Sequence, residues 1–146
     1  MVSINERPIS KKRVEASMQR ELNNYPYVSL ATQKLDNSWV WTPIWFAQLP
    51  ASERYVAFSA GKAGKVKRLR NFSTVQIRPC TATGRPLADA ESGNAILIND
   101  VAACADAHAA ICSKYGWQMR VLDFFSRLSG NYQRRQWIEF HLSETS

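Results

Sequence analysis

The 146-residue sequence has few of the residues from which most catalytic and metal sites are built. It contains three cysteines and two histidines. Cys80, Cys104 and Cys112 form no CxxC pair, and an odd count without a disulfide framework is typical of a reducing compartment. Neither His108 nor His141 lies in a serine, cysteine or acidic motif of known catalytic geometry, so nothing indicates a hydrolase.

Long hydrophobic runs are also missing. No apolar segment approaches the roughly 20 residues that a membrane-spanning helix needs. The N-terminal stretch MVSINERPISKKRV lacks the apolar core of a signal peptide. We therefore expect a cytoplasmic protein with one domain over residues 1–146 and a loose segment over 1–12.

Acidic residues are outnumbered, with 12 Asp and Glu against 19 Lys and Arg and a net charge of +7. This excess favours anionic partners. It is concentrated in SAGKAGKVKRLRN, Ser59 to Asn71, which carries five cations and no acid. A nucleotide-binding P-loop is excluded, because G-x-x-x-x-G-K-S/T would place Ser59 at the first glycine and Val66 at the hydroxyl.

Three interpretations of the basic run remain open. Glycines after a strand, followed by a helix N-terminus, suit a single phosphate group, with Ser59, Lys65 and Arg68 as donors. A nucleic acid would use the same cations together with aromatic stacking by Trp41 and Trp45. The charge pattern alone favours a solvated helix face over nucleic acid.

The hydrophobic patterning predicts a mainly β domain with flanking helices. Six short strands in a small chain need closure to hide their edges, which favours a small barrel. The strands are expected over 27–32, 39–47, 54–59, 74–80, 94–98 and 133–142, and the helices over 13–22, 62–70, 100–114 and 119–128. The first two strands are expected to form a hairpin across the turn Asp36-Asn37-Ser38. Asp100 is expected to cap its helix, and Val66 and Leu69 to face the core.

Cys104, His108 and Cys112 share one face of the helix expected over 100–114. Thiolate and imidazole suit zinc, but three ligands over two turns of one straight helix do not converge on a tetrahedral ion. The same stripe also reads as a core face, so we predict no metal site there and a buried His108.

Several blocks together resemble the FMN-binding split-barrel proteins, the pyridoxamine 5′-phosphate oxidase-like superfamily. Within it, the sequence is most similar to the group of probable deazaflavin (coenzyme F420)-dependent enzymes. The resemblance implies a six-stranded antiparallel split β-barrel that forms a homodimer, with a flavin-type cofactor at the interface. The blocks that carry it are YVSLAT at 27–32, TPIWF at 42–46, SAGKAGKVKRLRN at 59–71, TVQIRPC at 74–80 with TATGRP after it, and KYGW at 114–117.

The resemblance also implies residue roles. Ser59, Lys65 and Arg68 would grip the cofactor phosphate, and Gly61 and Gly64 would let the backbone approach it. Lys62 stands where the pattern has a small residue, and either adds a phosphate contact or is solvated. The ring and ribityl chain would be lined by Thr32, Thr42, Pro43, Ile44 and Trp45, although Trp45 equally suits the barrel core or a dimer contact.

The implied function is hydride transfer between the bound cofactor and a small-molecule substrate, with the cofactor carrying the chemistry. The similar group favours F420, whereas the use of Asn, Ile and Lys favours FMN, which is our choice. The alternatives are a non-catalytic flavin or haem carrier on the same fold and, less favoured, a nucleic-acid binder that uses the helix at 62–70.

Overall fold

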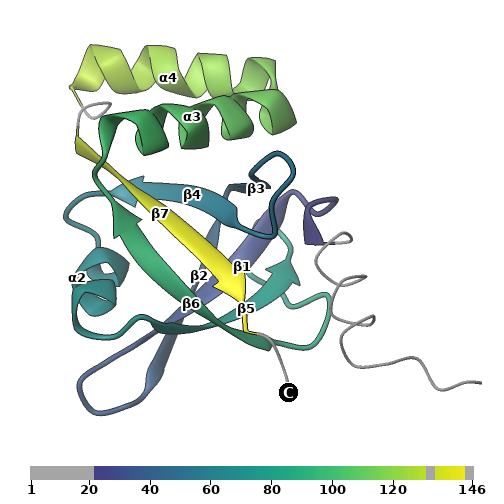
Figure 1. Cartoon of the computed structure of the whole chain (residues 1–146), viewed down its shortest axis with the longest axis vertical. Coiled ribbons are helices and arrows are strands. Elements are labelled where there is room, and N and C mark those ends of the chain that lie inside the picture. Colours follow the sequence, from purple (N-terminus) through teal and green to yellow (C-terminus); the bar gives the residue numbers. More distant parts are fainter. Residues whose placement is uncertain (1–21, 131–133, 144–146) are drawn as a thin grey trace, which may run out of the picture.

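The computed structural model describes residues 22–130 and 134–143. They contain seven strands and three helices, labelled as in Figure 1. The helix expected over 13–22 lies outside the described residues except for Leu22. The strands are β1 (Tyr27–Gln33), β2 (Trp39–Ile44), β3 (Phe46–Gln48), β4 (Tyr55–Ala60), β5 (Thr74–Cys80), β6 (Glu91–Ile98) and β7 (Arg135–Leu142), and the helices are α2 (Gly64–Asn71), α3 (Val101–Tyr115) and α4 (Trp117–Ser129).

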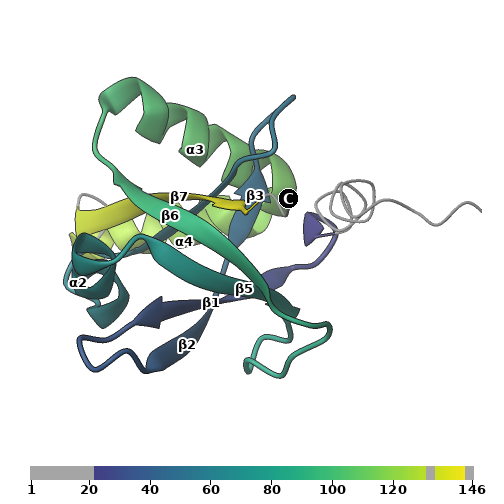
Figure 2. The same ribbon diagram turned by 60° about the horizontal axis from the view of Figure 1, so that its bottom comes forward.

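The strands form one strongly curved antiparallel sheet with the order β2-β1-β5-β6-β7-β4-β3 (Figures 1 and 2). The expectation of six strands in a closed barrel was wrong in two respects. The run expected as a single strand over 39–47 breaks at Trp45, so that β2 pairs with β1 and β3 pairs with β4. Within the described segments, β2 and β3 are the two edges of the sheet and do not pair with each other.

The predicted hairpin between β1 and β2 is confirmed. The Asp36 carboxylate accepts hydrogen bonds from the backbone N–H and the hydroxyl of Ser38, at 3.0 and 2.6 Å. Asn37 has a φ of 71°, the left-handed conformation that asparagine tolerates better than most residues. The turn therefore follows from its local sequence.

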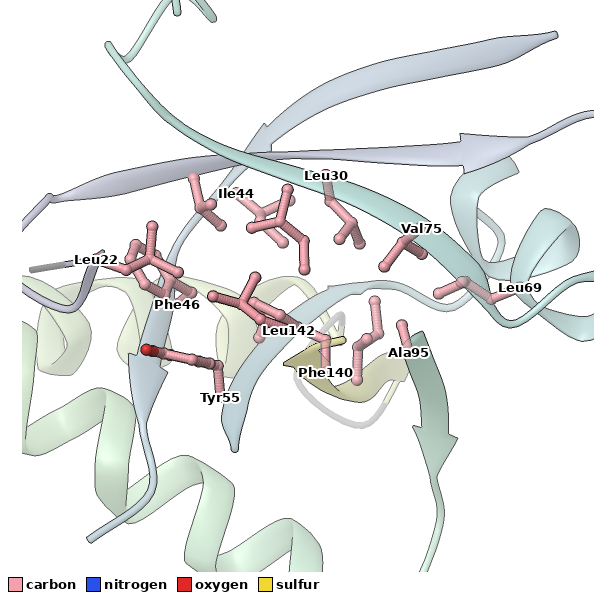
Figure 3. Close-up of a cluster of buried hydrophobic side chains, with 14 residues drawn as sticks. Leu22, Leu30, Ile44, Phe46, Tyr55, Leu69, Val75, Ala95, Phe140 and Leu142 are labelled. Carbon is pink, nitrogen blue, oxygen red and sulfur yellow. The ribbon is translucent and has the colours of Figure 1, made fainter. Parts of the chain in front are cut away.

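The alternation of side chains along the strands divides the hydrophobic residues between two clusters. On β4, Tyr55 and Ala57 point into the barrel, whereas Val56 points toward the helices. Figure 3 shows the interior cluster, to which β7 contributes Phe140 and Leu142. The full interior set is Leu22, Val28, Leu30, Ile44, Phe46, Tyr55, Ala57, Leu69, Val75, Ile77, Ala95, Ile138, Phe140 and Leu142.

The second cluster lies between the sheet and the helices. Its members include Ala107 and Ile111 of α3, Met119 of α4 and Val56 of β4. As predicted, Asp100 caps α3, accepting the N–H of Ala103 at 2.9 Å. The next helix was expected from residue 119, but α4 begins two residues earlier, directly after the Gly116 turn.

Helix α2 lies against β1 and β6. It buries Val66 and Leu69, as the sequence predicted, and it begins at Gly64 instead of Lys62. None of the helices in the described segments is long and apolar enough to cross a membrane.

Candidate phosphate and cofactor site

The end of β4 and the start of α2 bring together Ser59 and Lys65, two of the residues predicted to grip phosphate. Lys65 Nζ donates a hydrogen bond to Ser59 Oγ at 3.2 Å. Ser59 is buried and Lys65 is half-buried. Burial of the ammonium group, and next the positive charge of Arg68, lower the pKa of Lys65.

Arg68 lies one turn further along α2 and reaches β1. Its Nε donates a hydrogen bond to Thr32 Oγ1 at 2.6 Å, and Thr32 is fully buried. Thr32, which was predicted to line the cofactor ring, therefore holds Arg68, which was predicted to grip the phosphate. The structure thus gathers Thr32, Ser59, Lys65 and Arg68 around the start of α2.

The positive charges of Lys65 and Arg68 have no acidic partner within the described segments. Lys65 and Arg68 have neutral hydroxyl partners, and no carboxylate lies within 4.0 Å of either cation. The first turn of α2 carries no acidic residue, and its N-cap Ala63 offers no side-chain cap. Two half-buried cations beside the positive end of a helix dipole favour an anion.

The two glycines of the loop have different structural roles. Gly61 donates its N–H to the carbonyl oxygen of Arg134 at 2.8 Å, and an added Cβ would lie 2.7 Å from that oxygen. Gly64 makes room for a side chain, because an added Cβ would lie 2.7 Å from Arg68 Nη1. Lys62 is exposed. The N–H of Gly61 is thus already hydrogen-bonded to the Arg134 carbonyl oxygen. Gly64, which has no side chain, lets the Arg68 side chain lie over the start of the helix.

Two hollows flank these residues. One of about 250 Å³ lies beside Ser59, and one of about 450 Å³ lies beside Arg68. The first is lined by Phe58, Ser59, Ala60, Ser126, Arg134 and Arg135, and the second by Gln33, Lys34, Leu35, Asp36, Gly64, Lys67, Arg68 and Asn71.

The sequence analysis missed Arg134 and Arg135, which adjoin Ser59 from the opposite end of the chain. Arg135 is fixed by Asp123 Oδ1 at 2.8 Å and by Ser126 Oγ at 3.0 Å, and its guanidinium lies 4.7 Å from the centre of the Phe58 ring. The available signal was the arginine pair at the start of the last strand. The pairing of β4 with β7 sets Arg135 opposite Ala60, so that both arginines line the hollow beside Ser59.

The other residues predicted to line the ring are scattered. Thr42 is half-buried, with its Oγ1 3.5 Å from the carbonyl oxygen of Leu30, and Pro43 is exposed on the edge strand β2. Ile44 is 7% exposed and belongs to the interior cluster. Trp45 packs beneath the helices in the second cluster. Among the described residues, only Thr32 of this set is hydrogen-bonded to a residue predicted to grip phosphate.

The fold is shared with known structures, although the sequence is not. The sequence matches no protein-family profile and no curated protein. HutZ, a haem storage protein from Vibrio cholerae, matches with a TM-score of 0.61 and 13% identity, over 93% of both chains. A candidate pyridoxamine 5′-phosphate oxidase from Listeria innocua matches with a TM-score of 0.59 and 11% identity, over 90% of this chain and 94% of that one.

A flavoprotein structure belongs to the same set. A FAD-binding protein from Mesorhizobium loti matches with a TM-score of 0.57 and 13% identity, over 88% of this chain and 87% of that one. The chain therefore has the split-barrel fold of the pyridoxamine 5′-phosphate oxidase-like proteins, as its sequence blocks predicted.

Proposed function

We propose that this protein is an oxidoreductase that binds a flavin-type cofactor by its phosphate and transfers a hydride between that cofactor and a small-molecule substrate. The observation that carries the proposal is the pair of half-buried cations, Lys65 and Arg68, held by the hydroxyls of Ser59 and Thr32 without a carboxylate partner among the described residues. A phosphate monoester would complete this arrangement.

The residues present fit such a phosphate. Lys65 and Ser59 would donate to it from one side and Arg68 from the other, while Thr32 keeps the guanidinium in place. Binding an anion would offset the repulsion between the two cations. The cofactor would supply the hydride chemistry, so the protein itself needs no acid–base pair.

We further propose that the protein works as a homodimer. Helix α4 exposes an apolar stripe, and Ser126 of the same helix lines the hollow beside Ser59. A second subunit packed on this stripe would stand next to the hollow and supply the missing wall for the cofactor ring. The stripe consists of Trp117, Val121, Phe124, Phe125 and Leu128, which are between 45% and 72% exposed.

Titration with FMN, followed by its fluorescence, tests the proposal. Removal of one charge-assisted contact should weaken binding by about 1.5–3 kcal/mol, which is roughly 10- to 150-fold. We expect this loss for Lys65→Ala and for Arg68→Ala. Arg70→Ala is the matched control, because Arg70 is an exposed cation of the same helix. Equal affinities in all four proteins would refute the phosphate site.

A parallel titration with coenzyme F420 identifies the cofactor. Its longer anionic tail would extend over the exposed face of α2, so Lys67→Ala and Arg70→Ala should weaken F420 binding and leave FMN binding unchanged. Our choice is FMN. Tighter binding of F420 that depends on Lys67 and Arg70 would reverse it.

A carrier without enzymatic activity is the second candidate, because the fold is shared with a haem storage protein. A haem carrier would show haem absorbance and no dependence on Lys65. A nucleic-acid binder would show a steep salt dependence of DNA affinity and no chromophore. If the protein is a folded dimer and binds neither FMN nor F420, the haem carrier becomes the favoured candidate, followed by the nucleic-acid binder.

A further inference from the structure

Three side chains with metal-ligating atoms meet between α3 and α4, away from the basic site. His108 and Cys112 lie one helical turn apart on α3, and Asp123 faces them from α4. His108 Nε2 lies 2.8 Å from Asp123 Oδ2, and Cys112 Sγ lies 3.7 Å from both ring nitrogens of His108. The three ligand atoms all lie within 4.8 Å of one another.

This trio differs from the one that the sequence suggested. Cys104 is not part of it, because its Sγ donates to the carbonyl oxygen of Ile98 at 3.5 Å. The third group, Asp123, comes from the neighbouring helix. The objection that ligands from one straight helix cannot converge therefore does not apply. His108 is also not a core residue, since its side chain is 28% exposed.

We propose that His108, Cys112 and Asp123 bind one divalent transition-metal ion of the zinc class, with water as the fourth ligand. Tetrahedral bonds of about 2.0 Å to nitrogen and 2.3 Å to sulfur place these atoms about 3.5 Å apart. The observed nitrogen–sulfur separation is 3.7 Å. The nitrogen–oxygen pair must open from 2.8 Å to about 3.3 Å, which side-chain rotation supplies.

The surroundings support this assignment. Arg135 Nη1 binds Asp123 Oδ1 at 2.8 Å, which leaves Oδ2 directed at His108. Ligating carboxylates are normally oriented by such an outer hydrogen bond. A thiolate and a carboxylate together balance a divalent charge, and the sulfur–nitrogen set selects zinc or cobalt over magnesium or calcium.

The metal would have a structural role. It would bind α4 to α3 directly and hold Asp123, which in turn fixes Arg135 beside the hollow at Ser59. A simple ion-pair network of His108, Asp123 and Arg135 is the competing interpretation, and it predicts no dependence on metal. The proposal does not depend on the identity of the cofactor.

Cobalt(II) provides a direct probe. The full-length protein, freed of metal by a chelator and kept reduced, is titrated with Co²⁺ while its absorption spectrum is recorded. We expect one Co²⁺ per chain, a thiolate-to-cobalt charge-transfer band, displacement of Co²⁺ by Zn²⁺, and a higher Tm with Zn²⁺.

Matched variants assign the ligands. The band should disappear in Cys112→Ser and persist in Cys104→Ser, which removes a thiol from the same helix outside the trio. Asp123→Asn should weaken Co²⁺ binding at least tenfold. Circular dichroism checks that each variant is folded. No band in the wild-type protein, a band retained in Cys112→Ser, or a band lost in Cys104→Ser would overturn the proposal.

Discussion

The indole ring of Trp45 stacks on the phenol ring of Tyr115, with the ring centres 4.5 Å apart and the planes at 9°. The Tyr115 hydroxyl lies 3.0 Å from the N–H of Phe46, from which it accepts, and 2.7 Å from the carbonyl oxygen of Pro26, to which it donates. Tyr115, the last residue of α3, is thus bound to Trp45 and Phe46, where the chain passes from β2 to β3. Trp45 therefore anchors a helix here.

Removal of this hydroxyl should destabilise the protein. In Tyr115→Phe the ring stack is kept, but the N–H of Phe46 and the carbonyl of Pro26 lose their partner. We expect the free energy of unfolding to fall by about 1–3 kcal/mol, measured by urea denaturation. Tyr25→Phe is the control, because Tyr25 packs against the interior cluster and should be nearly neutral. Equal effects of the two changes would contradict the role of Tyr115.

Alanine at the two loop glycines should separate folding from binding. In Gly64→Ala the new Cβ meets the flexible end of Arg68, so FMN binding should weaken by no more than in Arg68→Ala while stability is kept. In Gly61→Ala it meets the backbone oxygen of Arg134, which must move. That change should cost about 1–3 kcal/mol of stability. Urea denaturation and FMN titration of both variants check this. A loss of stability in Gly64→Ala, with weaker FMN binding alone in Gly61→Ala, would contradict the assignment.

Lys114 should make the stability depend on pH. Its ammonium lies 3.6 Å from the centre of the Phe46 ring, and Nζ is buried without a hydrogen-bond partner in the described part of the chain. Burial lowers the pKa of Lys114 from 10.5 to about 7 in the folded protein. Between these values the unfolded chain binds more protons, so the free energy of unfolding should rise with pH.

Lys114→Met isolates this effect. The destabilisation by the charged lysine is fully present below its folded pKa of about 7, so the substitution should stabilise most there. The gain should shrink as the pH rises toward 10.5, the ordinary pKa of lysine. Urea denaturation at several pH values measures it. A gain that is constant with pH would mean that the lysine stays charged when buried.

The apolar stripe of α4 should control self-association. Phe124 and Leu128 are 60% and 71% exposed, so replacing both with Lys should barely change the stability of one subunit. We expect the double variant to be monomeric by light scattering and to bind FMN more weakly. A dimer that persists would place the subunit interface elsewhere.

Most of the fold was predictable because its signals are local. Alternation identified β1 and β7, and Asp100 and Asn37 marked a helix start and a turn. The strand break at Trp45 was not predictable, because no glycine or turn sequence marks it in WVWTPIWFA, and Pro43 lies two positions earlier, within β2. At the break, Trp45 stacks on Tyr115, which is 70 positions away in the sequence.

The site was predictable only in part. Ser59, Lys65 and Arg68 are close in sequence, and the helix geometry brings them together. Arg135 reaches the neighbouring hollow because β4 pairs with β7. Asp123 reaches His108 and Cys112 because α4 packs on α3. Contacts between distant segments of this kind leave no periodic trace in the sequence.

The two edge strands bear on how the protein resists aggregation. A long, regular edge strand is a template for strand addition by another chain. Here β2 carries Pro43, which has no N–H to offer, and β3 spans only Phe46–Gln48. A single residue, Trp45, connects the two strands, so neither can be lengthened at that junction without shortening the other. Addition of a strand from another chain at either edge is thereby disfavoured, whereas association through side chains remains open.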